Sequence, residues 1–122
     1  MTKLSPFSVA DTVARLSALI GEKGITLFAV IDHSGEAHAR GLELRDTKVV
    51  MFGNPEAGTP VMQAAPEAAL DLPLKVLVWD DAGQTKLTYT DPAALAARYG
   101  VPAELLAPLG AIHVLTDAAI SG

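Results

Sequence analysis

The amino-acid sequence predicts an α/β fold of the α+β type, a two-layer sandwich in which helices pack on a mixed sheet of about four strands. Two observations lead to this prediction. Short apolar runs rich in β-branched residues alternate with segments whose apolar residues recur at helical spacing. Residues 72–90 show the alternation and central turn of a β-hairpin, which makes at least one strand pair antiparallel. With 122 residues, half of them hydrophobic and 19% charged, the chain fits a single domain over residues 1–122.

The first helix is predicted to begin after Ser8, a suitable N-cap, and to end before Gly24. Its buried stripe recurs at helical spacing and consists of Val9, Val13, Leu16 and Ile20. Residues 25–31, ITLFAVI, are rich in β-forming and apolar residues. Because this run shows no polar face, it predicts a central strand that is covered on both faces.

The middle of the chain alternates helices with strands. Asp32 is placed to cap a short helix over residues 33–40. Residues 48–53 form the next predicted strand, and Pro55 suits the first turn of a helix that Pro66 stops.

The last third of the chain begins with the hairpin of residues 72–90, in which DDAGQ supplies the turn. Asp91 then opens a helix that ends at Gly100. A final helical region covers residues 102–119, and Pro108 is predicted to divide it.

Composition excludes several classes of function. A net charge of −5, a pI near 5.0 and the lack of any run of basic residues argue against a nucleic-acid binder and against a membrane-surface binder. The absence of cysteine excludes thiolate nucleophiles, disulfides and zinc ribbons. No apolar run approaches the roughly 18 residues that a membrane helix needs. We therefore expect a soluble cytoplasmic protein without a cofactor.

Five ordered blocks, FAVIDH, GLEL, VVMFGNP, AGTPVMQAAP and DLPLKVLVW, resemble the domain-of-unknown-function family numbered 302, a small bacterial and archaeal α/β domain. The resemblance covers roughly residues 7–99. It implies the fold and a homodimer, and the family has no established activity. Another branch of the family looks like it carries Cys near Phe52 or Gly53 and near Leu74. This chain has no Cys there, which puts any thiol or soft-metal role in doubt.

FGNPEAGT, residues 52–59, is similar to a phosphate-binding loop. A Walker loop needs Lys after its second Gly, but here Thr59 follows Gly58 directly, and Pro55 lacks one of the N–H groups of such a cradle. Nucleotide hydrolysis is therefore not supported. Gly53, Asn54, Gly58 and Thr59 remain candidates for binding a small anion at the helix N-terminus. The favoured alternative is that Asn54 only caps the helix and Gly53 only permits the turn.

Asp32 and His33 follow the first predicted strand, where α/β proteins often place reactive groups. His33 could serve as a general base or a metal ligand, although Asp32 as an N-cap is the favoured interpretation. With His38 and His113 included, the histidines lack HExxH or other ligand spacing, so no metal site is predicted.

Asp71 and Lys75 stand four residues apart in a segment predicted to be extended, and they could pair with each other or with Asp32. Lys75 is either a guard of an edge strand or a cation for a ligand. Trp79 shares its face of the strand with Lys75 and Leu77. Such a mixed face is expected at a dimer surface, and it is equally expected where a strand is buried under a helix.

These observations favour a non-enzymatic homodimer that binds a small anion or metabolite where the ends of strands converge. The predicted site gathers Asp32, His33, Gly53, Asn54, Gly58, Thr59, Asp71 and Lys75. One alternative is an enzyme in which His33 is the acid/base and the helix N-terminus stabilises an oxyanion. Another is a purely structural or protein-binding domain.

Overall fold

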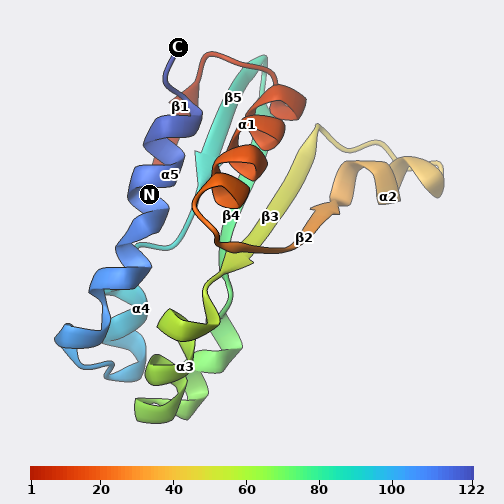
Figure 1. The fold of residues 1–122 in the computed structure, drawn as a ribbon. Coiled ribbons are helices and arrows are strands. Elements are labelled where there is room, and N and C mark those ends of the chain that lie inside the picture. The colour runs from red at the N-terminus through yellow and green to blue at the C-terminus, as the bar shows by residue number, and fades with distance from the viewer.

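A computed structural model describes all 122 residues and shows an α+β fold built on one five-stranded sheet (Figure 1). The order across the sheet is β1-β5-β4-β3-β2, and every neighbouring pair is antiparallel. The strands are β1 (Thr2–Ser5), β2 (Thr26–Asp32), β3 (Thr47–Gly53), β4 (Leu74–Asp81) and β5 (Gln84–Thr88). The predicted fold class is confirmed, whereas the sheet has one strand more than expected and is antiparallel rather than mixed.

Five α-helices and three 3₁₀ turns complete the fold. The helices are α1 (Val9–Glu22), α2 (His33–Ala39), α3 (Pro55–Ala64), α4 (Pro92–Tyr99) and α5 (Ala111–Ala119), and the turns are η1 (Pro66–Asp71), η2 (Ala103–Leu105) and η3 (Ala107–Gly110). Helices α1 and α5 pack against each other, while α3 and α4 gather at one end of the sheet. Helix α2 projects away from the body beyond β2 and β3 (Figure 1).

Local signals in the sequence place the starts of α1 to α4 correctly, whereas the predicted helical region 102–119 is helical only from Ala111, after the turns η2 and η3. The four predicted N-caps each accept a hydrogen bond from a backbone N–H of the first turn, and they are Ser8, Asp32, Asn54 and Asp91. Gly100 ends α4 in the left-handed conformation, with φ of +67°, which glycine adopts without steric cost.

The core lies between the sheet and the layer of α1 and α5. Alternate residues of β3 and β4 point into it and are buried, as are the inward residues of the two helices: Val50, Phe52, Val76, Val78, Leu16, Ile20, Ile112 and Leu115. The intervening residues of β3 and β4 point to the other face and are only partly buried. Trp79 lies on that second face, where its indole N–H donates a 3.0 Å hydrogen bond to Thr88.

The prediction of a central, covered strand over residues 25–31 is wrong. Strand β2 is the edge of the sheet, with only β3 beside it, and all seven of its residues are exposed. Phe28 and Val30 expose 52% and 41% of their surface. An apolar run is expected both for a strand covered by its own chain and for one covered by a partner, and the local sequence does not distinguish these cases.

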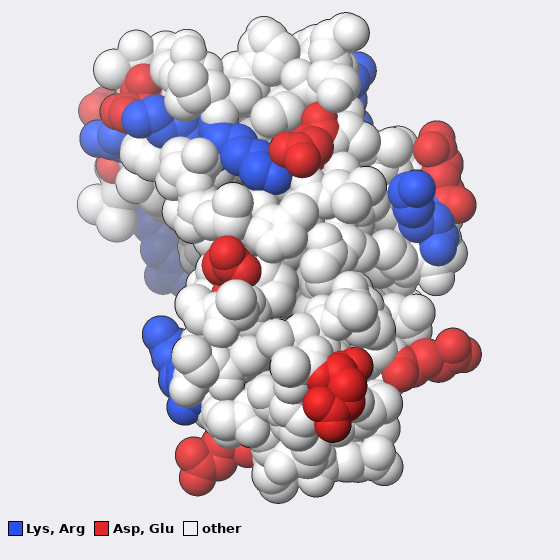
Figure 2. All heavy atoms as spheres, turned by 90° about the vertical axis from the view of Figure 1, so that its left-hand side faces the viewer, with Lys and Arg blue, Asp and Glu red and all other residues white.

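No helix of the chain has both the length and the apolar character needed to cross a bilayer. On the face that carries α4 and α5, Lys and Arg side chains are scattered among neutral surface, several of them beside acidic groups (Figure 2). Lys3, for example, lies 2.8 Å from Asp117 of α5.

Candidate functional site

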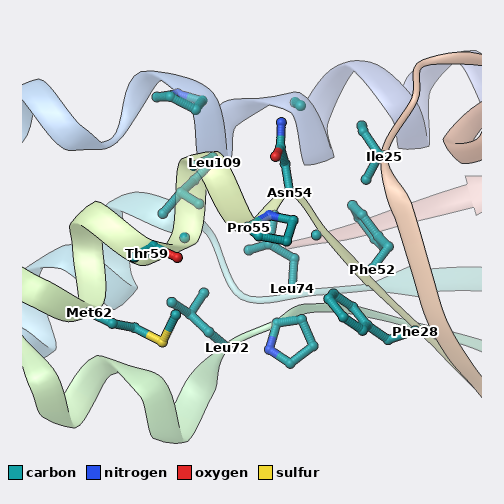
Figure 3. Close-up of a pocket in the computed structure, with 16 residues that line it drawn as sticks. Ile25, Phe28, Phe52, Asn54, Pro55, Thr59, Met62, Leu72, Leu74 and Leu109 are labelled. Atoms are coloured by element: carbon teal, nitrogen blue, oxygen red, sulfur yellow. The ribbon is translucent and has the colours of Figure 1, made fainter.

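A pocket of about 280 Å³ lies at the end of the sheet where β2 begins, β3 ends and β4 begins (Figure 3). Helix α3 forms one wall, and the segment from η3 into α5 forms another. The lining includes Ile25, Phe28, Phe52, Gly53, Asn54, Pro55, Gly58, Thr59, Met62, Leu72, Pro73, Leu74 and Leu109. This volume is near the lower end of the range for small-molecule pockets.

The wall of the pocket is almost entirely apolar. Among its lining residues only Asn54 and Thr59 have polar side chains, and no charged side chain takes part. Apolar surface gains about 25 cal/mol for each Å² removed from water. The pocket therefore suits the apolar body of a ligand, with polar recognition confined to the α3 side.

Asn54 has two hydrogen-bonding ends with different uses. Its Oδ1 accepts a 2.9 Å hydrogen bond from the N–H of Glu56 and so caps α3. This bond engages the oxygen, so the amide nitrogen is the group of Asn54 that could donate a hydrogen bond to a ligand. Thr59 lies farther along the same helix (Figure 3). Both the capping role and a place at the pocket therefore hold for Asn54.

Glycines and a bulge shape the wall between β2 and α3. The pairing of β2 with β3 shifts register between Leu27 and Ala29, so Phe28 occupies a bulge. Bulges redirect side chains beside functional sites. A side chain at Gly53 would meet the Phe28 ring and Pro73 at 3.5 Å. The Phe28 ring thus lies over Gly53 at the outer margin of the pocket.

The structure separates polar groups that we predicted would lie close together. Asp32 pairs with Lys48 at one end of the β2–β3 ladder, whereas Thr26 pairs with Gly53 at the other end. Six residues of strand span roughly 20 Å. Asp32 and exposed His33 therefore lie far from Asn54. Strands β2 and β3 run in opposite directions, so their C-terminal ends lie at opposite ends of the ladder that they form.

Asp32 has a structural role in α2. It accepts hydrogen bonds from the N–H of Gly35 at 2.9 Å and from the Ser34 hydroxyl at 2.8 Å. These two bonds lower the pKa of Asp32, and Lys48 at 3.8 Å lowers it further. The geometry gives His33 no part in the pocket, which removes the predicted pairing of His33 with the N-terminus of α3.

Asp71 and Lys75 border a separate small cavity of about 70 Å³ rather than the main pocket. Asp71 ends η1 and accepts hydrogen bonds from the Tyr99 hydroxyl at 2.5 Å and from Arg98 at 2.9 Å. The bond from Tyr99 is the main reason that the pKa of Asp71 is lowered. The sequence predicted an extended segment here, but Asp71 is the last residue of a 3₁₀ turn, and a cis Leu72–Pro73 bond separates it from β4.

One polar cluster was not predicted from the sequence. The Tyr89 hydroxyl lies 2.7 Å from Nδ1 of His113, and Nε2 of His113 lies 3.7 Å from Asp91. Lys3 donates to the Thr116 hydroxyl at 2.7 Å. Helical spacing places His113 and Thr116 on one face of α5, but their partners lie far away in the sequence. These contacts tie α5 to β1 and to the segment that follows β5.

The fold and the pocket define a class: a small α+β domain with an antiparallel sheet and an apolar, ligand-sized pocket at one end of that sheet. The model of the family "Domain of unknown function DUF302" matches residues 1–117, and the chain belongs to this family. The crystal structure of an uncharacterized conserved DUF302 protein from Bacillus stearothermophilus has the same fold, with a TM-score of 0.80 over 98% of this chain and 94% of that one, at 18% sequence identity.

Longer relatives also match. The chain is 40% identical over 102 residues to a protein named fluoride-specific ion channel FluC 1 from Brucella suis biovar 1 (strain 1330), and to one of the same name from Brucella abortus biovar 1 (strain 9-941). The match covers 83% of this chain, but only 40% and 38% of those proteins. The chain thus spans about two fifths of the length of these relatives.

Proposed function

We propose that this domain is a non-catalytic binding module for a small amphiphilic molecule, with an apolar body and one end that accepts a hydrogen bond. The observation that carries the proposal is the pocket, whose apolar walls meet polar side chains only at Asn54 and Thr59. The apolar body fills the space between Phe52, Met62 and Leu109. The polar end meets the N-terminal turn of α3.

A small inorganic anion fits this pocket less well than an amphiphile does. Burying an ion in an apolar site is costly unless a counter-charge or several hydrogen bonds replace its water. The pocket offers no Lys, Arg or His. A carboxylate or hydroxyl at the rim, in contrast, keeps its solvent contact while its chain occupies the apolar walls.

The same side chains argue for binding rather than catalysis. General acid–base catalysis needs a group that titrates near the working pH, and a hydroxyl nucleophile needs a base beside it. An amide and a threonine hydroxyl meet neither requirement.

Calorimetric titration with octanoate, compared with 1-octanol, tests the proposal. Gly58→Leu is the informative variant, because Gly58 lines the pocket and a Cβ added there has only Met62 within 4 Å, at 3.9 Å, so we expect the leucine side chain to occupy the pocket. Leucine also favours the helix over glycine by up to about 1 kcal/mol. We expect octanoate to bind the wild type and Gly58→Leu to bind it at least about tenfold more weakly without losing stability. Gly21→Ala, in open space on α1, is the control and should bind normally.

Two results contradict the proposal. One is the absence of heat from both probes with the wild-type protein. The other is equal affinity of the wild type and Gly58→Leu, which would place any binding outside the pocket.

We also propose that the domain works as a homodimer. The support is the exposed apolar edge of β2, together with the second face of the sheet, where Met51, Leu77 and Trp79 are only partly buried. A contiguous exposed apolar patch is typical of sites that bind another protein. Sedimentation velocity is expected to give the mass of two chains, and a single-chain mass over the accessible concentrations would contradict it.

The curated relatives suggest a second candidate function. A match of 102 residues that is 40% of the Brucella suis protein implies a length of about 255 residues, so about 150 residues lie outside the match. Pores of channels are built from membrane-spanning segments. We propose that the matching part is an accessory domain joined to a channel, and that the domain described here assists a fluoride channel in the same way. Fusion of two partners raises their effective concentration.

Growth in fluoride tests this second candidate. A strain without the gene for this chain should be more sensitive to fluoride than its parent, and the wild-type chain should restore growth. Identical growth of the two strains over a fluoride series would contradict the role.

A further inference from the structure

The small cavity of about 70 Å³ at the start of β4, which we call the Lys75 cavity, contains a cation without a counter-charge. It is lined by Asp71, Leu74, Lys75, Thr90, Leu95 and Ile112. Each of the other partly buried lysines forms an ion pair: Lys3 with Asp117, Lys48 with Asp46 and Lys86 with Asp81. Lys75 is partly buried too, but its ammonium group only donates a long hydrogen bond, 3.4 Å, to the carbonyl of Pro73. A charge that is partly removed from water in this way is stabilised by an anionic partner.

Asp71 brings a carboxylate to the same cavity, and one of its oxygens is available to a ligand. The hydrogen bonds from the Tyr99 hydroxyl and from Arg98 both go to Oδ2. Oδ1 can therefore accept a hydrogen bond from a bound molecule. The pKa of Asp71 is lowered mainly by the Tyr99 hydrogen bond, and the charge of Lys75 contributes as well. Asp71 and Lys75 thus lie close enough to interact, although they form no ion pair with each other.

We propose that the Lys75 cavity binds a small zwitterion of the α-amino acid type, with its carboxylate at Lys75 and Thr90 and its ammonium group at Asp71. An α-amino acid carries its two charged groups on one carbon atom, so it can bridge a carboxylate and an ammonium group that do not touch. The hydroxyl of exposed Thr90 is a second donor for the ligand carboxylate. The proposal does not rest on the binding of an amphiphile in the main pocket.

A zwitterion matches the two charges of the cavity better than an ion of either sign. A simple carboxylate would be attracted to Lys75 but repelled by Asp71. A simple amine would be attracted to Asp71 but repelled by Lys75. Like charges at short range disfavour each other's ionised form, whereas a zwitterion meets an opposite charge at each end.

The size of the cavity and its apolar residues limit the side chain of the ligand. Leu74, Leu95 and Ile112 are buried and give the cavity an apolar surface. A cavity of about 70 Å³ has room for several water molecules, and so for an amino acid no larger than glycine or alanine. Because burial of a methyl group on apolar surface is favourable, L-alanine is the best probe.

Titration of the ¹⁵N-labelled protein with L-alanine, followed by NMR, tests the proposal. The backbone amide signals of Lys75 and Thr90 are expected to shift in a saturable manner at millimolar concentrations. The signals of Asn54 and Thr59, which line the main pocket, should stay in place. Propionate lacks the amino group and ethylamine lacks the carboxylate, so each should bind at least about tenfold more weakly than L-alanine.

Two results of these titrations overturn the proposal. The first is the absence of a saturable shift at Lys75 and Thr90 with L-alanine. The second is equal affinity for L-alanine and propionate, which would leave Asp71 without a part in binding. If L-alanine binds as expected while octanoate does not bind at all, this site stands and the function proposed for the main pocket fails.

Variants of the lining residues test which groups hold the ligand. Lys75→Met removes the charge with little change in side-chain length and should weaken L-alanine binding at least about tenfold. Thr90→Val, at an exposed position where folding is not at risk, should weaken it about threefold. Lys23→Met is the matched control, because Lys23 also has no carboxylate partner but is exposed at the end of α1. Wild-type affinity in Lys75→Met or in Thr90→Val overturns the proposal.

Discussion

Asn54 combines two roles whose consequences can be measured separately. Its oxygen accepts a hydrogen bond from the N–H of Glu56 at the start of α3, and its amide nitrogen is the donor that a ligand could use. Loss of an N-cap costs about 1 kcal/mol, whereas aspartate caps a helix as well as asparagine does. An aspartate, however, has no N–H to donate to a ligand and brings a negative charge.

We therefore expect Asn54→Ala to lower the free energy of unfolding by about 1 kcal/mol, as measured by urea denaturation. Asn54→Asp should keep wild-type stability and yet bind octanoate more weakly than the wild type. Unchanged octanoate affinity in Asn54→Asp would show that the residue serves α3 only as a cap.

The contact between Tyr99 and Asp71 predicts a particular pH dependence of stability. The Tyr99 hydrogen bond lowers the pKa of Asp71 below its ordinary 3.8, so this contribution is present above that value and is lost as pH falls through the lower folded pKa. The hydrogen bond to Asp71 raises the pKa of Tyr99 above 10.0, so the contribution is lost again as pH rises through the raised value.

Tyr99→Phe removes the contact at every pH. It should be less stable than the wild type between about pH 5 and 9, and the two proteins should converge in strong acid and strong base. Midpoints of urea unfolding across the pH series measure this difference. A gap of constant size from acid to base would assign the loss to packing instead of the ionised contact.

At the scale of elements, the sequence predicts those features that depend only on contacts between residues close in the chain. The caps at Ser8, Asp32, Asn54 and Asp91 act within one helical turn, so the sequence locates the starts of α1 to α4. The position of β2 depends on the strands that flank it, which local pattern does not reveal. Strand β1 is short and pairs with β5 more than 80 residues later, so no local pattern in the sequence indicates it.

The edge of the sheet should have low local stability when the chain is alone. Helix α2 contacts the sheet chiefly through β3, and β2 has no outer neighbour. At low protein concentration, hydrogen exchange followed by mass spectrometry should show residues 26–39 exchanging through local opening well before β3 and β4. Exchange of residues 26–39 as slow as that of the two inner strands would contradict this expectation.

At the scale of the whole molecule, the antiparallel topology decides which residues form a site. If β2 and β3 were parallel, Asp32, His33 and Asn54 would lie at the same end of the sheet. The two strands run in opposite directions, so Asp32 and His33 lie at the other end from Asn54. The candidate residues Gly53, Asn54, Gly58 and Thr59 do line the pocket. Its apolar walls come from segments between Ile25 and Ala111, and the meeting of such distant segments is beyond local sequence patterns.

The three methionines give the most direct test of the pocket. Met62 lines it, Met51 lies on the second face of the sheet, and Met1 is at the N-terminus. With the methionine methyl groups labelled with ¹³C and each signal assigned by a Met→Leu variant, octanoate should shift the Met62 signal in a saturable manner. Met1 and Met51 should stay in place. A Met62 signal that does not move, or three signals that move alike, would contradict binding in this pocket.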